Sequence, residues 1–128
     1  MNTNAPILLV DDHTDRRRTL KALLEQAGYA VSTASNGADA LNKLHSGLRP
    51  CLILLDLIMP VKSGYEFRDE QRRDPNLSGI PVIIYSAMTD AFENARHLGA
   101  AAYFQVPVAT DTVLQLVELH RLKLGPAS

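Results

Sequence analysis

Three aspartates and one serine directly follow apolar runs of the sequence, where their side chains could do chemistry together. Asp11 and Asp12 follow one run, Asp56 follows a second and Ser86 follows a third. Two unit charges about 4 Å apart repel each other by about 4 kcal/mol at an effective dielectric constant near 20. A protein keeps such a cluster when a cation neutralises it or when one carboxyl group stays protonated.

The oxygen-only set of donors indicates a hard cation. Mg²⁺ typically uses one or two carboxylates and leaves room for phosphate oxygens. Asp11, Asp12 and Asp56 therefore predict a Mg²⁺ site. The alternative is that these aspartates are only polar strand ends exposed to water. The metal site is favoured because the aspartates stand at the ends of apolar runs.

Short apolar runs alternate with segments of helical period along the whole chain, and these elements must position the carboxylates. The runs are residues 6–10, 29–33, 51–55, 81–85 and 102–105. Strict alternation predicts an α/β fold with a parallel sheet and helices on both faces. Three of the runs are apolar nearly throughout, as in central strands that are covered on both faces. The carboxyl ends of parallel strands share one edge, so the aspartates and Ser86 should converge there.

The segments between the runs predict five helices. Apolar residues at 20, 23, 24 and 27 form one stripe of a first helix, which Gly28 should end. Asn36 is the expected N-cap of the second helix. The remaining predicted helices are residues 64–73, 89–98 and 110–122.

Composition limits the class of protein. The 128 residues carry 13 Lys and Arg against 14 Asp and Glu, whereas a dedicated nucleic-acid binder normally has a basic excess. The longest apolar runs are far shorter than the roughly 20 residues that span a bilayer. The single cysteine, Cys51, excludes an internal disulfide and fits a reducing compartment. We expect one cytoplasmic domain over residues 1–128, with flexible ends at 1–5 and 125–128.

Several motifs together resemble the receiver domain of two-component response regulators over essentially the whole chain. The matching residues are Asp11-Asp12, Asp56-Leu57-Ile58-Met59-Pro60-Val61-Lys62-Ser63-Gly64, Tyr85-Ser86-Ala87, Gly99-Ala100, and Tyr103 with Pro107. The resemblance implies a flavodoxin-like (βα)5 three-layer sandwich with the parallel sheet order 2-1-3-4-5.

The resemblance also implies the chemistry of the carboxylates. Asp56 would take a phosphoryl group from a phosphohistidine and form an acyl phosphate. Asp11, Asp12 and the Ile58 backbone carbonyl would join Asp56 in holding Mg²⁺. Such a protein is a phosphoacceptor with at most self-phosphorylation and self-dephosphorylation, rather than a conventional enzyme.

Two further residues stand at the switch positions of the family. Ser86 would turn inward and donate a hydrogen bond to the phosphoryl group, and Tyr103 would follow this movement. The alternatives are a plain strand-end hydroxyl for Ser86 and a half-buried sheet aromatic for Tyr103.

One residue departs from the family pattern. Receivers nearly always have a lysine directly before the proline after the fifth strand, where this chain has Val106 before Pro107. Valine cannot make the charge-assisted hydrogen bond, which contributes about 1.5–3 kcal/mol. Either Asp56 is still phosphorylated with weaker coupling to the switch, or the domain is a pseudo-receiver that docks partners without phosphorylation. The intact carboxylates and Ser86 favour the first hypothesis.

Three cations are candidates to replace the lysine: Arg16 and Arg17 on the first helix, which should begin at the mouth of the pocket, and Lys62 in the loop after Asp56. Each is expected to be a solvated surface charge instead. The Val106-Pro107 bond is commonly cis in the family, although X-Pro bonds are mostly trans in general.

Two other classes of protein fit the sequence poorly. A flavin-binding flavodoxin needs a phosphate loop rich in Ser, Thr or Gly after the first strand, but residues 11–15 are acidic. A phosphatase with an aspartyl nucleophile needs Asp-x-Asp there, whereas Asp11 and Asp12 are adjacent.

The expected partners are proteins. A sensor histidine kinase or phosphotransfer protein would supply the phosphoryl group, and a downstream protein would bind the surface of the fourth helix, fifth strand and fifth helix. No direct contact with nucleic acid and no membrane insertion are expected, and the chain should be a monomer or weak homodimer. Leu119 and Leu122 lie on the far side of the last predicted helix, where they are either a docking patch or scattered surface leucines.

Overall fold

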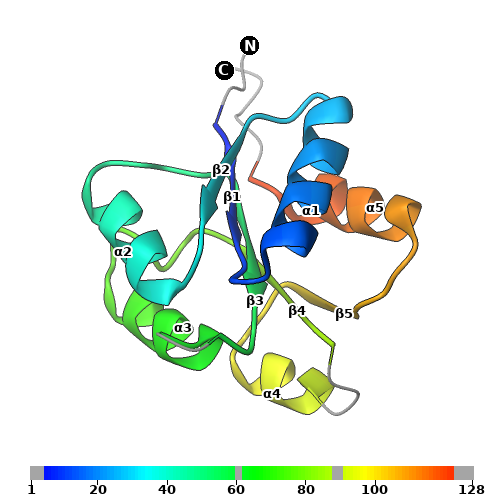
Figure 1. The fold of residues 1–128 in the computed structure, drawn as a ribbon. Helices are drawn as coiled ribbons and strands as arrows, with labels where there is room; N and C mark the ends of the chain where they lie inside the picture. Colours follow the sequence, from blue (N-terminus) through cyan, green and yellow to red (C-terminus); the bar gives the residue numbers. More distant parts are fainter. Residues whose placement is uncertain (1–4, 60–61, 88–90, 123–128) are drawn as a thin grey trace.

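The computed structural model describes residues 5–59, 62–87 and 91–122, in which strands and helices alternate strictly (Figure 1). The strands are β1 (Ile7–Val10), β2 (Val31–Ala34), β3 (Leu52–Asp56), β4 (Val82–Ser86) and β5 (Ala102–Gln105). The helices are α1 (Thr14–Gln26), α2 (Gly37–His45), α3 (Gly64–Arg73), α4 (Ala91–His97) and α5 (Thr110–His120).

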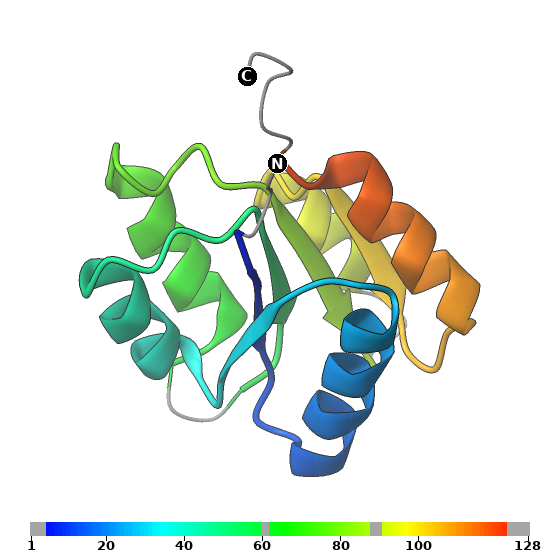
Figure 2. The ribbon, with the colours of Figure 1, turned by 90° about the horizontal axis from the view of Figure 1, so that it is seen from above.

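The five strands form one parallel sheet in the order β2-β1-β3-β4-β5. Helices α1 and α5 cover one face of this sheet, and α2 and α3 cover the other (Figure 2). Helix α4 joins the second side, since its Ala95 packs in the same core as Ala40 of α2 and Phe67 of α3. The predicted α/β class and the flavodoxin-like strand order are both confirmed.

Burial follows the position of each strand in the sheet. All residues of β1, β3 and β4 are buried, whereas β2 and β5 at the edges are mostly half-buried. These central strands carry the apolar runs that the sequence marks as covered on both faces. Along β3, Ile53 and Leu55 pack in the core of α2, α3 and α4, and Leu52 and Leu54 pack in the core of α1 and α5.

Local signals place most helix ends correctly. Asn36 is the N-cap of α2, because its side chain accepts a hydrogen bond of 2.8 Å from the Asp39 amide. Gly28 lies just beyond α1 with φ of +100°, a conformation that favours glycine.

The predicted end of the last helix is wrong by two residues. Helix α5 ends at His120, and Arg121 has an extended backbone. The Leu122 amide then donates a hydrogen bond of 2.8 Å to the Cys51 carbonyl at the start of β3. This tertiary hydrogen bond takes an amide that the helix would otherwise use.

Some predictions fall on residues outside the described ranges. These are the flexible ends at 1–4 and 125–128, the first two residues of the predicted helix 89–98, and Pro60 and Val61 of the family motif. Among the helices that the structure describes, none is long and apolar enough to cross a lipid bilayer.

Candidate functional site

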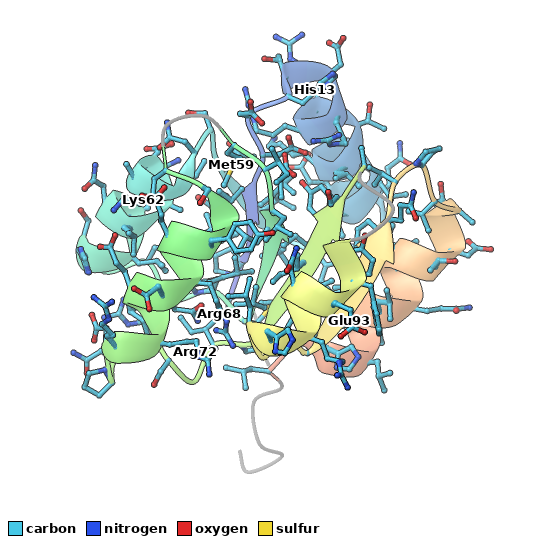
Figure 3. The ribbon with its side chains drawn as sticks, turned by 90° about the horizontal axis from the view of Figure 1, so that it is seen from below. His13, Met59, Lys62, Arg68, Arg72 and Glu93 are labelled. Atoms are coloured by element: carbon cyan, nitrogen blue, oxygen red, sulfur yellow. The ribbon has the colours of Figure 1, made fainter. Side chains whose placement is uncertain are left out.

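The carboxyl ends of the central strands bring the predicted acidic residues together at one edge of the sheet. Asp11 follows β1 and Asp56 ends β3, and both side chains are buried, whereas Asp12 is exposed. Oxygens of Asp11, Asp12 and Asp56 lie within 4.8 Å of one another. Figure 3 places His13 at the start of α1 and Met59 between β3 and α3, on the two segments that frame this edge.

Both carboxylate oxygens of Asp11 accept hydrogen bonds. The Tyr85 hydroxyl donates to Oδ2 at 2.6 Å, and the His13 amide donates to Oδ1 at 2.8 Å. The Arg16 guanidinium adds two more, from Nε to Oδ2 at 2.7 Å and from Nη2 to Oδ1 at 3.0 Å. Tyr85 stands in a family motif, but the sequence predicts no contact for its hydroxyl. Burial and the Asp11 carboxylate raise the pKa of Tyr85 well above its usual value.

Arg16 lies in the carboxylate pocket, so its expected role as a solvated surface charge is wrong. Besides Asp11, its Nη2 donates a hydrogen bond of 2.9 Å to Asp56 Oδ2. The reason is the position of α1, which begins at Thr14 next to the sheet edge and directs a first-turn arginine back over it. Hydrogen bonding to Asp11 raises the pKa of Arg16 further above its usual value.

The other two candidate cations have different partners. Arg17 Nη1 donates a hydrogen bond of 2.8 Å to the backbone carbonyl of Asp11, not to a carboxylate. Lys62 forms an ion pair with Glu70 of α3. Of the three cations, the structure places only Arg16 against the buried carboxylates.

Asp56 combines burial with nearby negative charge. Its pKa is raised to about 7, mainly by burial and then by the Asp11 carboxylate, while Arg16 acts in the opposite direction. The Ile58 amide donates a hydrogen bond of 3.3 Å to Asp56 Oδ1, which also favours the charged form. Asp56 is therefore poised between the neutral and ionised forms near neutral pH.

This raised pKa predicts that Mg²⁺ binding depends on pH. Only the ionised carboxylate binds a cation, and the neutral form of Asp56 predominates below a pKa of about 7. We expect the affinity for Mg²⁺ to weaken by about tenfold per pH unit below that value and to level off above it. Calorimetric titrations at several pH values between 6 and 8 measure this.

The control is Asp56→Asn, which has no carboxyl group to titrate at this position. Its affinity for Mg²⁺ should be weak and nearly constant over the same range. An equal affinity of the unaltered protein at pH 6 and pH 8 would contradict the expectation.

The structure places Ser86 and Tyr103 on neighbouring strands. Ser86 is buried at the end of β4, next in the chain to Tyr85, which pairs in register with Asp56 of β3; Ser86 itself pairs with Gln105 of β5. Tyr103 is half-buried, and its ring forms a T-shaped contact with the Phe92 ring, with 5.8 Å between the ring centroids. Phe92 is 52% exposed on α4 and was not a predicted site residue. Their roles as switch residues stay a prediction.

Val106 stands at the position where receivers nearly always have a lysine. Its side chain is half-buried against the core of α1 and α5, and its bond to Pro107 is cis, as is common in the family. Val106 and Arg16 line the same hollow of about 490 Å³ between α1 and the start of α5.

The two leucines that are predicted to contact a partner lie in different surroundings. Leu119 is 70% exposed on α5 and lines a shallow groove with Asp111 and Gln115. Leu122, beyond the helix, is 51% exposed and lines another pocket beside Tyr29. Their use as one docking patch stays a prediction.

The residues at this edge fit a hard divalent cation. Three carboxylates offer oxygens close together, two of them buried, and a charged arginine already compensates part of their negative charge. Oxygen ligands of this kind are those that Mg²⁺ prefers.

Comparison with known proteins gives the same family as the motifs. The model of the response regulator receiver domain matches residues 7–118. A probable transcriptional regulator, ycf27 of Guillardia theta, is 36% identical over 109 residues, covering 84% of this chain and 41% of the relative. Protein PilH of Pseudomonas aeruginosa is 32% identical over 115 residues, covering 88% of this chain and 94% of the relative. The chain thus spans less than half of ycf27 but nearly all of PilH.

A solved structure also resembles the fold closely. The response regulator protein TrrA of Thermotoga maritima, in complex with Mg²⁺ and BeF, superposes with a TM-score of 0.80 at 32% identity. The match covers 89% of this chain and 96% of TrrA. On its sequence motifs, its strand order and these similarities, the chain belongs to the response regulator receiver domain family of two-component signalling.

Proposed function

We propose that this receiver domain accepts a phosphoryl group on Asp56 in a Mg²⁺-dependent reaction. The donor is a phosphohistidine of a sensor histidine kinase or a phosphotransfer protein. The main support is the position of the buried Asp56 carboxylate, whose oxygens lie within 4.8 Å of those of Asp11 and Asp12 at one edge of the sheet.

The transfer is a simple displacement at phosphorus. A carboxylate oxygen of Asp56 attacks the phosphorus atom, and a new O–P bond forms as the P–N bond to the histidine breaks. The imidazole nitrogen leaves with the bonding electron pair and takes up a proton. The product is an acyl phosphate on Asp56.

The chain supplies charge compensation and orientation. Asp11, Asp12, Asp56 and the Ile58 carbonyl would hold Mg²⁺, which offsets the negative charge of the incoming group. The Ile58 amide already donates to Asp56 Oδ1 and fixes the direction of the carboxylate. The Ser86 hydroxyl, at the end of the neighbouring strand, would donate to a phosphoryl oxygen.

The output would be a change in a protein-binding surface of α4, β5 and α5. Tyr103 would connect the phosphorylation site to this surface, because it lies on β5 and contacts Phe92 of α4. A shift of Tyr103 would therefore alter the exposed Phe92 ring and the surface around it. The partner is a downstream protein, and Leu119 and Leu122 are candidate contacts.

The second candidate is a pseudo-receiver that docks a partner without phosphorylation. The observation that favours it is Val106, which cannot supply a positive charge at the position before Pro107. The retention of all three carboxylates favours phosphorylation.

Amide NMR spectra distinguish the two candidates. The protein with Mg²⁺ is compared before and after beryllofluoride, which mimics the phosphoryl group, and Asp56→Asn is the control. We expect shifts at Asp56, Ser86 and Tyr103 that are absent in the control. Shifts confined to the carboxylate pocket would mean that phosphorylation is poorly transmitted. A folded protein without shifts would favour the docking module.

A further inference from the structure

Arg16 is bound to both buried carboxylates of the pocket. It donates two hydrogen bonds to Asp11 and one to Asp56, all between 2.7 and 3.0 Å, and its guanidinium lies 5.6 Å from the centre of the Tyr85 ring. One arginine thus supplies the positive charge that holds two anionic side chains side by side.

These contacts leave Asp11 no free position for a cation. A carboxylate has about four lone-pair directions, and Asp11 already accepts four hydrogen bonds. The two from Tyr85 and the His13 amide come from fixed parts of the fold. The two from Arg16 come from a long side chain that is 25% exposed. Arg16 must therefore release Asp11 before this carboxylate can bind a metal ion.

The contact with Asp56 places the guanidinium where a phosphoryl group would be attached. Arg16 Nη2 lies 2.9 Å from Asp56 Oδ2. If either Asp56 oxygen carried a phosphoryl group, its oxygens would lie within a few ångströms of this guanidinium. The planar fork of an arginine matches phosphate oxygens with two parallel hydrogen bonds.

The surroundings allow the side chain to move while its helix stays in place. Arg16 lines a hollow of about 490 Å³ between α1 and the start of α5, with the small apolar side chain of Val106 on its wall. The start of α1 is held independently, since Arg17 donates to the Asp11 carbonyl and the His13 side chain accepts from the Arg16 amide.

We propose that Arg16 exchanges one anion for another: it binds Asp11 and Asp56 while Asp56 is unmodified, and it binds the phosphoryl oxygens once Asp56 is phosphorylated. This inference rests on the proposed phosphorylation of Asp56. It gives the chain a phosphoryl-binding cation from α1 in the same hollow as Val106.

Two measurements on Arg16→Met test the proposal, because they should change in opposite directions. Loss of a competing cation should raise the affinity for Mg²⁺ by about fivefold, the effect of a partly exposed ion pair. Loss of the phosphoryl contact should slow phosphorylation by a small phosphoramidate at saturating Mg²⁺ by about tenfold. In that reaction the P–N bond breaks and ammonia is the leaving group.

Two matched variants serve as controls. Arg18→Met removes the same charge from an exposed position of the same helix and should change neither quantity by more than about twofold. Arg16→Lys keeps a positive charge and should recover part of the phosphorylation rate, which a purely structural role would not explain. Amide spectra of each variant establish that it is folded.

Each outcome decides the question. A higher affinity for Mg²⁺ with an unchanged or faster reaction would show that Arg16 only competes with the cation, and would overturn the proposal. Unchanged values for both quantities would overturn it as well. Failure of the unaltered protein to react with phosphoramidate or beryllofluoride would instead overturn the proposed function, and the phosphoryl contact with it.

Discussion

The Gly64→Ala variant should lose about 3 kcal/mol of unfolding free energy, the upper part of the range for overpacking a dense region. A Cβ atom at Gly64 would lie 2.8 Å from Leu57 Cα, 2.9 Å from the Asp56 carbonyl oxygen and 3.0 Å from the Leu57 carbonyl oxygen. All three neighbours are backbone atoms, which cannot rotate away as a flexible side chain can. The Gly64 amide also donates a hydrogen bond of 3.0 Å to the Leu57 carbonyl, and this bond holds the two backbone segments close together.

Denaturant unfolding of Gly64→Ala and of a matched variant, Gly79→Ala, measures this effect. A Cβ atom at Gly79 would meet no atom within 4 Å, so this control should be nearly neutral. Because the strained contact adjoins Asp56, Gly64→Ala should also weaken Mg²⁺ binding. Equal stability of the two variants would contradict the expectation.

The Arg68→Met variant should lose about 2 kcal/mol of unfolding free energy, because Arg68 is a buried cation that donates to three acceptors, one of them on the buried Gln71. It donates to the Leu98 and Gly99 carbonyls, just beyond the end of α4, at 2.9 and 3.0 Å, and to Gln71 Oε1 at 2.8 Å. Gln71 in turn donates to the Leu77 and Ile80 carbonyls. Burial lowers the pKa of Arg68. Its positive charge nevertheless interacts favourably with the negative, C-terminal end of the α4 helix dipole.

Arg72→Met is the matched control, because Arg72 is an exposed arginine one turn later on the same helix (Figure 3). Its loss should cost at most a few tenths of a kcal/mol. Hydrogen exchange should further show faster opening of α4 in Arg68→Met, because the end of α4 would lose its hydrogen bonds to the Arg68 side chain of α3. Equal unfolding free energies for the two variants would argue against a role of Arg68 in holding α4.

The spacing of apolar residues and the residues that mark helix ends determine much of the fold. The runs at residues 6–10, 51–55 and 81–85 are apolar because both faces of the sheet are covered there. They correspond to the central strands β1, β3 and β4. Asn36 and Gly28 mark helix ends through local chemistry that needs no tertiary partner. Convergence of Asp11 and Asp56 at one edge follows from parallel strand direction alone.

Long-range contacts decided what sequence patterns could not show. The end of α5 depends on a hydrogen bond between Leu122 and Cys51, two residues far apart in the chain. The contacts of the Arg68 guanidinium join α3 to the end of α4 in the same way.

The sequence by itself determined the family, the α/β fold and the three carboxylates, because these depend on residue type, spacing and strand direction. Only the tertiary structure decided the partner of those carboxylates. Arg16, Arg17 and Arg18 look alike in the sequence, yet the rotation of α1 about its axis places only Arg16 among them against the carboxylates of Asp11 and Asp56. Which side chain of a helix reaches a buried charge depends on how the helix packs, and three adjacent arginines carry no signal of that.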